Sequence, residues 1–212
     1  MTGLPPPEDR AAEPLTVFVV DDDEAIRRSL LRALDKRGYR VEAHDSAASF
    51  LAAHQPGRHG CLVLDYGMSG MNGLELQAHL NAIGDELPVI FITGHGGVPE
   101  SVQAIKGGAL DFLEKPFRQA DLIERIDAAL EIARSQLAAR QDDRRRQAMF
   151  DRLTAREMEI VDHIVSHPAE TSSKEIALIL GISPRTVDHH RARILEKLGL
   201  RSIVELIAVA KG

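Results

Sequence analysis

The sequence contains one cysteine, Cys61, among 212 residues. A single thiol excludes an internal disulfide framework and a zinc site built from cysteines, and its apolar neighbours predict a small buried side chain. No apolar run approaches the roughly 20 residues that a membrane-spanning helix needs. The N-terminal segment, residues 1–14, lacks the basic and then apolar order of a signal peptide and is expected to be a disordered leader. These features predict a cytoplasmic protein with no membrane partner.

Charge is unevenly distributed along the chain, although its total is only −6. Residues 144–212 contain 12 Lys and Arg against 9 Asp and Glu, a net charge of +3, which leaves −9 for residues 1–143. An acidic first part and a mildly basic second part indicate two domains with different partners. The length also suits two small domains, and the apolar content of 44% suffices for a real core.

Five short apolar runs alternate with amphipathic segments between Thr16 and about Ala139. In chain order the runs are TVFVV, RVEAH, CLVLD, LPVIFIT and LDFLEK. Strand–helix units in series predict a parallel sheet with helices on both faces. The near-continuous apolar character of CLVLD suits a strand that is buried on both sides. We therefore predict an α/β domain with a doubly wound, five-stranded parallel sheet.

A charge-dense segment, AARQDDRRRQAMF, follows this domain. The helical spacing of Leu122, Ile126 and Ala129 predicts that the last helix of the sheet domain continues into it, so that residues 136–149 form a helical linker. Strand signals are missing after the linker. Four helices are expected there instead: LTAREMEIVDHIV, SSKEIALILG, SPRTVDHHRARILEKLG and SIVELIAVAK. The second domain is therefore predicted to be an all-α, four-helix domain.

Several residues mark where helices begin and end. Thr154 with Glu157 forms a capping box, and Ser183 before Pro184 gives an N-cap with proline at the first helical position. Asp23 is expected only to begin a helix, where the helix dipole favours a carboxylate. Two glycines are stop signals, Gly181 and Gly199. Seven apolar side chains are expected to form the second core: Ile176, Ile179, Leu180, Val187, Ile194, Leu195 and Leu198.

Polar residues stand at one edge of the predicted sheet. Asp21 and Asp22 follow the first strand, Asp65 ends the third, Thr93 ends the fourth, and Lys115 ends the fifth. Ligand sites in open α/β sheets lie at the carboxyl ends of the strands, so these five residues are expected to converge. Three carboxylates make a hard oxygen site that suits Mg²⁺, and the lysine supplies further positive charge.

Four motifs, VVDDD, LVLDYGMSGMNG, FITGHG and DFLEKPF, resemble in this order the receiver domain of two-component response regulators. The resemblance covers residues 15–135 and implies a flavodoxin-like fold. It also implies that Asp65 accepts a phosphoryl group from a phosphohistidine of a sensor histidine kinase. Mg²⁺, or Mn²⁺ in its place, would be held by three carboxylates and one backbone carbonyl, those of Asp21, Asp22, Asp65 and Gly67.

The same resemblance assigns roles near the ends of the last two strands. Lys115, followed by a cis-proline position at Pro116, would pair with the phosphoryl oxygens. Thr93 would hydrogen-bond the phosphoryl group, and Phe112 would rotate inward with it. Phosphorylation would then alter the face made by the fourth helix, the fifth strand and the fifth helix, and would promote homodimerisation. The family often has proline where Ser69 stands, which leaves the flexibility of that loop and the phosphoryl lifetime open.

The second part of the chain resembles the LuxR-type DNA-binding domain over residues 150–212. The segments LTARE, KEIA, SPRTVDHHRARILEKLG and ELIAVA are in register with that family. Its two central helices have the layout of a helix-turn-helix, whose second helix enters the major groove. The resemblance implies base contacts from Asp188, His189 and Ala192. Phosphate contacts are implied for Lys174, Arg185, Thr186, Arg191 and Arg193.

Together the two resemblances identify the chain as a member of the FixJ-like subgroup of response regulators. This implies a transcription factor that binds double-stranded promoter DNA, with RNA polymerase as a candidate partner. No enzymatic turnover is expected beyond self-phosphorylation and slow autodephosphorylation. Two other classes remain as alternatives. A Mg²⁺-dependent phosphatase that used Asp65 would need a second aspartate at the position of Gly67, and a small-molecule-sensing LuxR-type regulator would need an apolar pocket in the first half.

Overall fold

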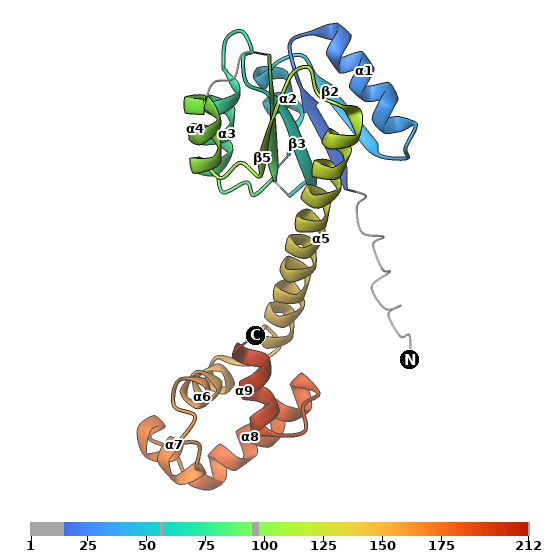
Figure 1. The fold of residues 1–212 in the computed structure, drawn as a ribbon. Helices are drawn as coiled ribbons and strands as arrows, with labels where there is room; N and C mark the ends of the chain where they lie inside the picture. Colours follow the sequence, from blue (N-terminus) through green and yellow to red (C-terminus); the bar gives the residue numbers. More distant parts are fainter. Residues whose placement is uncertain (1–14, 56, 95–97, 212) are drawn as a thin grey trace. The chain divides into compact units, whose positions relative to one another are not determined.

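The first part of the chain forms a parallel sheet of five strands (Figure 1). The computed structural model describes residues 15–55, 57–94 and 98–211, so the predicted leader lies outside the described residues. The strands are β1 (Thr16–Val20), β2 (Arg40–His44), β3 (Gly60–Asp65), β4 (Val89–Thr93) and β5 (Asp111–Glu114). Their order in the sheet is β2-β1-β3-β4-β5. The predicted doubly wound parallel sheet is therefore confirmed.

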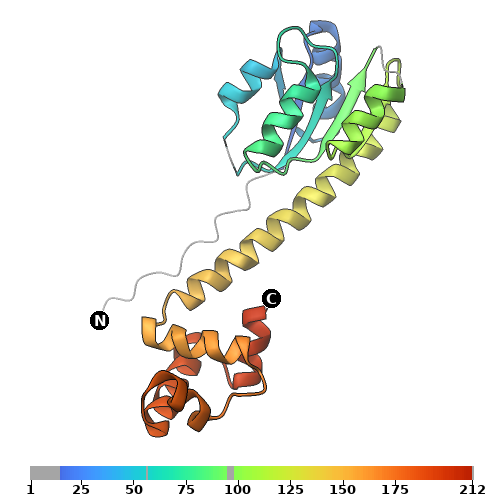
Figure 2. The same ribbon diagram turned by 90° about the vertical axis from the view of Figure 1, so that its left-hand side faces the viewer.

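Helices cover both faces of this sheet. They are α1 (Glu24–Asp35), α2 (Ala47–Ala53), α3 (Gly73–Ala82), α4 (Val98–Lys106) and the first part of α5 (Gln119–Phe150). Buried residues of α2, α3 and α4 belong to one apolar cluster, and those of α1 and α5 belong to the other. Figure 2 views the sheet from the side of α3 and α4, which lie in front of it.

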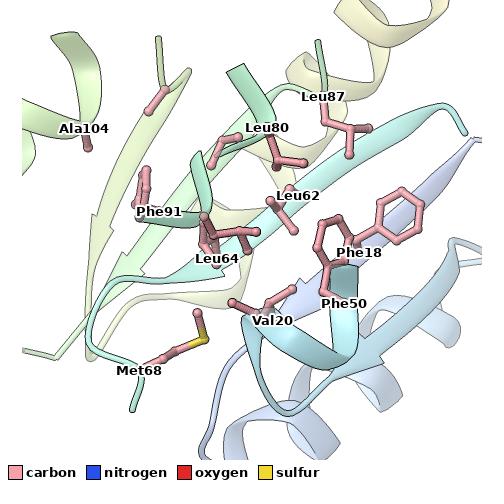
Figure 3. Packing of buried hydrophobic residues seen from close by; sticks show 14 residues of the cluster. Phe18, Val20, Phe50, Leu62, Leu64, Met68, Leu80, Leu87, Phe91 and Ala104 are labelled. Atoms are coloured by element: carbon pink, nitrogen blue, oxygen red, sulfur yellow. The ribbon is translucent and has the colours of Figure 1, made fainter. Parts of the chain in front are cut away.

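Alternate residues of β1 enter the two clusters because successive side chains of a strand point to opposite faces. Phe18 and Val20 belong to the cluster that Figure 3 shows, together with Phe50 of α2, whose ring centroid lies 5.7 Å from that of Phe18. Val17 and Val19 face the opposite cluster. Every residue of β1, β3 and β4 is buried, as the continuous apolar runs predict. Cys61 of β3 is fully buried among these residues, as expected.

The helix α5 is continuous from Gln119 to Phe150. Its buried residues recur at helical spacing and are Leu122, Ile126, Ala129, Leu130 and Ala133. The segment 136–149 is helical throughout, as that spacing predicts. The chain separates into two compact units between Ala138 and Ala139.

Between residues 151 and 211, which the structure describes in full, the second unit contains four further helices. They are α6 (Ala155–Ser166), α7 (Ser173–Leu180), α8 (Pro184–Leu198) and α9 (Ile203–Lys211). The predicted capping box is present, since Thr154 N donates to Glu157 Oε2 at 2.8 Å and Glu157 N donates to Thr154 Oγ1 at 3.3 Å. Gly181 and Gly199 end α7 and α8 with left-handed φ angles of 65° and 68°, a conformation that glycine adopts without steric cost.

For one of the seven residues predicted to form the core of this unit, the prediction is wrong. Ile176, Val187, Ile194 and Leu198 are buried, and Leu180 and Leu195 pack against them. Ile179, however, is 57% exposed. The short helix α7 has apolar residues on both of its faces, so only one face can point into the core.

Among the described helices, none combines the length and the hydropathy that crossing a bilayer requires.

Candidate functional site

Three carboxylates meet at the carboxyl edge of the sheet. Asp21 directly follows β1, Asp22 comes next, and Asp65 is the last residue of β3. One oxygen from each lies within 4.8 Å of the others. Asp21 and Asp65 are buried, whereas Asp22 is exposed. The predicted convergence of these three residues is therefore present in the fold.

Lys115 neutralises part of this charge. Its Nζ atom donates to Asp21 Oδ2 and to Asp65 Oδ1, both at 2.7 Å. Burial raises the pKa of Asp21, and the hydrogen bond from Lys115 only partly opposes this effect. Burial alone would lower the pKa of Lys115, but its hydrogen bonds to Asp21 and Asp65 outweigh burial, so that pKa is raised. The ammonium group is thus held in its charged form between two carboxylates.

The remaining oxygens accept hydrogen bonds from the adjoining loops. Gly67 N donates to Asp65 Oδ2 at 3.1 Å, and Asp23 N donates to Asp21 Oδ1 at 2.8 Å. Asp23 is also the N-cap of α1, because its carboxylate accepts from the amides of Ala25 and Ile26. The expectation that Asp23 only begins a helix agrees with this position.

Sequence reasoning missed two residues that shape this edge. Arg27 Nη1 donates to the carbonyl of Asp21 at 2.7 Å. The sequence placed Arg27 on an amphipathic helix but gave no indication that its side chain reaches this edge. A Cβ atom on Gly73 would lie 2.5 Å from the carbonyl oxygen of Asp65 and 2.8 Å from the ring of Phe91. Only glycine therefore lets the start of α3 approach the end of β3 this closely.

Thr93 and Phe112 lie on the side of the sheet that α4 covers. Thr93 is buried at the end of β4, and its carbonyl accepts a hydrogen bond from Lys115 N at 2.7 Å. Phe112 of β5 pairs with Phe91 of β4 and is half-buried against the same cluster. Because Thr93 stands two residues after Phe91, it points to the same face. The peptide bond between Lys115 and Pro116 is cis.

The oxygen set fits a small divalent cation. Ligands of an octahedral Mg²⁺ are about 3 Å apart when they are neighbours and about 4 Å apart when they are opposite. One oxygen each of Asp21, Asp22 and Asp65 lies within 4.8 Å of the others, so these oxygens would move closer together around an ion. Three carboxylates face one ammonium group, which leaves negative charge that a divalent ion would neutralise. Carboxylate and carbonyl oxygens are also the ligands that Mg²⁺ prefers.

The predicted DNA-contacting residues lie on α8, except for Lys174 on α7. Seven of the eight are exposed: Lys174, Arg185, Thr186, Asp188, His189, Ala192 and Arg193. The turn between the two helices begins at Gly181, and Ser183 caps α8 through a hydrogen bond from Thr186 N at 3.1 Å. Each of these seven side chains is therefore accessible on the helix-turn-helix.

Arg191 differs from these because it is partly buried. Its Nη1 atom donates to the carbonyl of Thr171 at 2.8 Å and to Ser173 Oγ at 3.1 Å. Ser173 Oγ in turn donates to Asp188 Oδ1 at 2.5 Å. This network connects the start of α7 to α8. Sequence reasoning missed Ser173, which no motif distinguishes from its neighbours.

Family models match both parts of the chain. The model of the response regulator receiver domain matches residues 17–127. The model of bacterial regulatory proteins of the luxR family matches residues 151–210. The first match includes every residue of the carboxylate and lysine cluster, and the second includes the whole helix-turn-helix.

Individual relatives extend over nearly the full chain. The transcriptional regulatory protein TdiR of Thauera aromatica is 43% identical over 192 residues, which are 91% of this chain and 83% of TdiR. The transcriptional regulatory protein FixJ of Azorhizobium caulinodans is 44% identical over 200 residues, 93% of this chain and 92% of FixJ. The solved structure of the response regulator StyR is similar with a TM-score of 0.82 at 40% identity, and the similarity covers 93% and 98% of the two chains.

A receiver unit followed by a LuxR-type helix-turn-helix unit defines a response regulator transcription factor. The chain belongs to the FixJ-like response regulators, in agreement with the sequence-based identification. A receiver domain implies a sensor kinase as partner, and a LuxR-type unit implies DNA binding. Receiver domains typically bind Mg²⁺, which the acidic cluster suits. The receiver match over residues 17–127 disfavours a small-molecule-sensing domain in the first part of the chain. The relatives are transcriptional regulators, which is consistent with a role other than that of a phosphatase.

Proposed function

We propose that Asp65 is the phosphoacceptor of this regulator. The carboxylate would attack the phosphorus of a phosphohistidine on the sensor kinase, forming an O–P bond as the P–N bond breaks. The leaving imidazole keeps the electron pair of that bond. The observation that supports this assignment is the position of Lys115, 2.7 Å from both Asp65 and Asp21 at the carboxyl edge of the sheet. A carboxylate is a weak nucleophile, so positioning and charge neutralisation carry the reaction.

The chain's own groups would hold both the cation and the phosphoryl group. The carboxylates of Asp21, Asp22 and Asp65 and the carbonyl of Gly67 would bind Mg²⁺ or Mn²⁺. Bound there, the ion would supply positive charge that offsets the charge of the phosphoryl oxygens. The ammonium group of Lys115 would leave Asp65 and pair with a phosphoryl oxygen. Beyond self-phosphorylation and slow loss of the phosphoryl group, the protein would catalyse no reaction.

Phosphorylation would act on the surface of α4 and β5. The added phosphate carries about −1.5 to −2 charges, which Thr93 would meet with a hydrogen bond while Phe112 turns inward. Val102, Ile105 and Leu110 on this surface are 44%, 49% and 37% exposed. Exposed apolar side chains on α4 and directly before β5 suit contact with a second copy of the receiver. We propose that the altered surface forms the dimer.

A dimer would bring two DNA-binding units to two half-sites with a raised effective concentration. Asp188, His189 and Ala192 would face the bases, and the basic side chains around them would contact phosphates. We assign residues 15–135 to the receiver, 136–149 to the linker and 150–212 to the DNA-binding domain. The regulator would act in the cytoplasm, where promoter DNA and the candidate partner RNA polymerase are found.

The acceptor assignment can be tested with acetyl phosphate as phosphoryl donor. Asp65→Asn should abolish Mg²⁺-dependent labelling and the binding of beryllofluoride while the fold is retained. The matched control is Asp35→Asn, which removes the same charge from an exposed position at the end of α1 and should label like the wild type. Full labelling of Asp65→Asn would place the acceptor elsewhere.

A further inference from the structure

Ser69 connects the two loops that surround the acidic cluster. It stands between β3 and α3 and donates two hydrogen bonds to the same atom, Asp22 Oδ2. The first comes from Ser69 N at 3.0 Å and the second from Ser69 Oγ at 3.2 Å. Asp22 belongs to the loop between β1 and α1. These bonds therefore connect the two loops at the carboxyl edge of the sheet.

The bonds leave one carboxylate oxygen of the cluster free. Both oxygens of Asp21 and both oxygens of Asp65 accept hydrogen bonds. Asp22 Oδ2 accepts the two bonds from Ser69. Asp22 Oδ1 accepts no hydrogen bond from any residue that the structure describes. It is therefore the oxygen that a cation can take without displacing a donor.

The energetic role of Ser69 follows from the exposure of Asp22. An exposed aspartate rotates freely and loses side-chain entropy when it binds an ion. Two donors on one oxygen fix the carboxylate before the ion arrives, and hydrogen bonds to a charged acceptor are stronger than those to a neutral one. Groups that orient a metal ligand in this way commonly change metal affinity 10- to 100-fold.

Serine at this position supplies both donors. A proline would have neither the backbone N–H nor the hydroxyl group, and an alanine would keep the N–H alone. Threonine would keep both donors. The chain therefore allows the two hydrogen bonds to be removed in steps, with a conservative variant that restores them.

We propose that Ser69 is a positioning residue for the cation ligand Asp22 and sets the Mg²⁺ affinity of the unphosphorylated receiver. It holds Asp22 Oδ2 so that Oδ1 remains available to the ion, and it takes no part in the transfer of the phosphoryl group. The inference rests on the proposed function, because it assumes that Asp22 binds the cation.

The test is calorimetric titration of the full-length, unphosphorylated protein with MgCl₂. Ser69→Thr should bind Mg²⁺ like the wild type, Ser69→Ala should bind more weakly, and Ser69→Pro should bind most weakly, with a dissociation constant raised about 10-fold or more. The matched control is Ser29→Ala on α1, which removes an exposed hydroxyl and should leave the affinity unchanged.

A second measurement separates positioning from structural damage. The labelling rate with acetyl phosphate should fall for Ser69→Ala at low Mg²⁺ and recover the wild-type value at saturating Mg²⁺. The urea unfolding midpoint of this variant in EDTA should match that of the wild type. Equal Mg²⁺ dissociation constants for the wild type, Ser69→Ala and Ser69→Pro would overturn the proposal, and so would a labelling defect that persists at saturation. Failure of the proposed function has a different result, since the wild type itself would then bind no Mg²⁺ and take no label on Asp65.

Discussion

Lys115 Nζ lies 2.7 Å from Asp65 Oδ1. The lysine side chain is 19% exposed and the aspartate side chain only 8%, so this pair is largely removed from water. Breaking a buried ion pair from one side leaves an uncompensated charge, which costs far more than the loss of a surface pair. The ammonium group therefore stabilises the receiver while no divalent cation is bound.

Replacing Lys115 by alanine should lower the free energy of unfolding by about 3 kcal/mol in EDTA. Asp21 and Asp65 lose their shared cation in this variant. In saturating Mg²⁺ most of the loss should disappear, because the ion supplies replacement charge and binds only the folded state. Urea unfolding of the full chain with and without Mg²⁺ measures both values. Lys106→Ala, at an exposed position of α4, is the charge-matched control, and a Lys115→Ala loss that Mg²⁺ does not change would contradict the prediction.

Because of Glu157, the second unit should lose stability at acidic pH. It is buried, and burial alone would raise its pKa, but hydrogen bonds from Lys197 Nζ and the Thr154 amide outweigh burial and lower the pKa to about 2. The ionised Glu157 carboxylate therefore adds to the free energy of unfolding. This contribution is complete above pH 4.5, the ordinary pKa of a glutamate, and is lost as the pH falls from 4.5 towards 2. Its full size is about 3 kcal/mol.

Glu157→Gln should remove this pH dependence. Urea unfolding of the full chain between pH 7 and pH 3, followed through amide exchange in α6 and α8, measures the effect. Glu159→Gln is the control, because Glu159 is an exposed neighbour on the same helix and should change stability by no more than about 0.5 kcal/mol. An acid transition in α6 that is unchanged in Glu157→Gln would show that another carboxylate is responsible.

Arg193 should contribute to the affinity of the protein for DNA, and equally for every DNA sequence. It is exposed on α8, and we propose that it contacts a phosphate. Arg193→Ala should weaken binding to all DNA sequences alike and reduce the slope of log K against log salt by about 0.9. Arg144→Ala removes the same charge from α5 and serves as control. Titrations at several salt concentrations give the slopes, and an unaltered slope for Arg193→Ala removes this residue from the phosphate contacts.

Asp188 and Ser173 should act together on base preference. Ser173 Oγ holds one carboxylate oxygen of Asp188, which leaves the other oxygen able to accept a hydrogen bond from a base amino group. Asp188→Ala should change discrimination at one base pair by about 1–3 kcal/mol. Ser173→Ala should produce a smaller change at the same base pair, with non-specific affinity retained.

Competition binding against operators with single base-pair replacements measures these preferences. Ser166→Ala is the control, because it removes an exposed hydroxyl from α6. Changes at two different base pairs would mean that the hydrogen bond between Ser173 and Asp188 does not couple them during recognition.

The sheet and most of the acidic cluster could be predicted because they follow from chain order. Asp21 and Asp65 come at the ends of two parallel strands, and such ends meet at one edge whatever the details of packing. Lys115 follows the last strand and reaches the same edge. The convergence of these residues therefore needed only the strand assignments and the topology.

The errors and omissions have a different origin. Ile179 and Leu180 are neighbours on a short helix that is apolar on both faces, so periodicity could not decide which of them faces the core. The hydrogen bonds of Ser69 to Asp22 and of Ser173 to Asp188 join residues far apart in the chain. Such bonds depend on loop conformation and side-chain rotamers, which carry no local sequence signal.

The lone thiol of Cys61 reports on the integrity of the sheet. Burial raises its pKa to about 12, with a small contribution from the charge of Asp127, so at neutral pH the native protein presents neither an exposed sulfur nor a thiolate. Alkylating reagents react with the thiolate and must wait until β3 separates from its neighbours. The rate of Cys61 modification therefore measures how often the first unit opens, and no cysteine has to be introduced for the measurement. The second unit contributes nothing to the signal because it contains no cysteine.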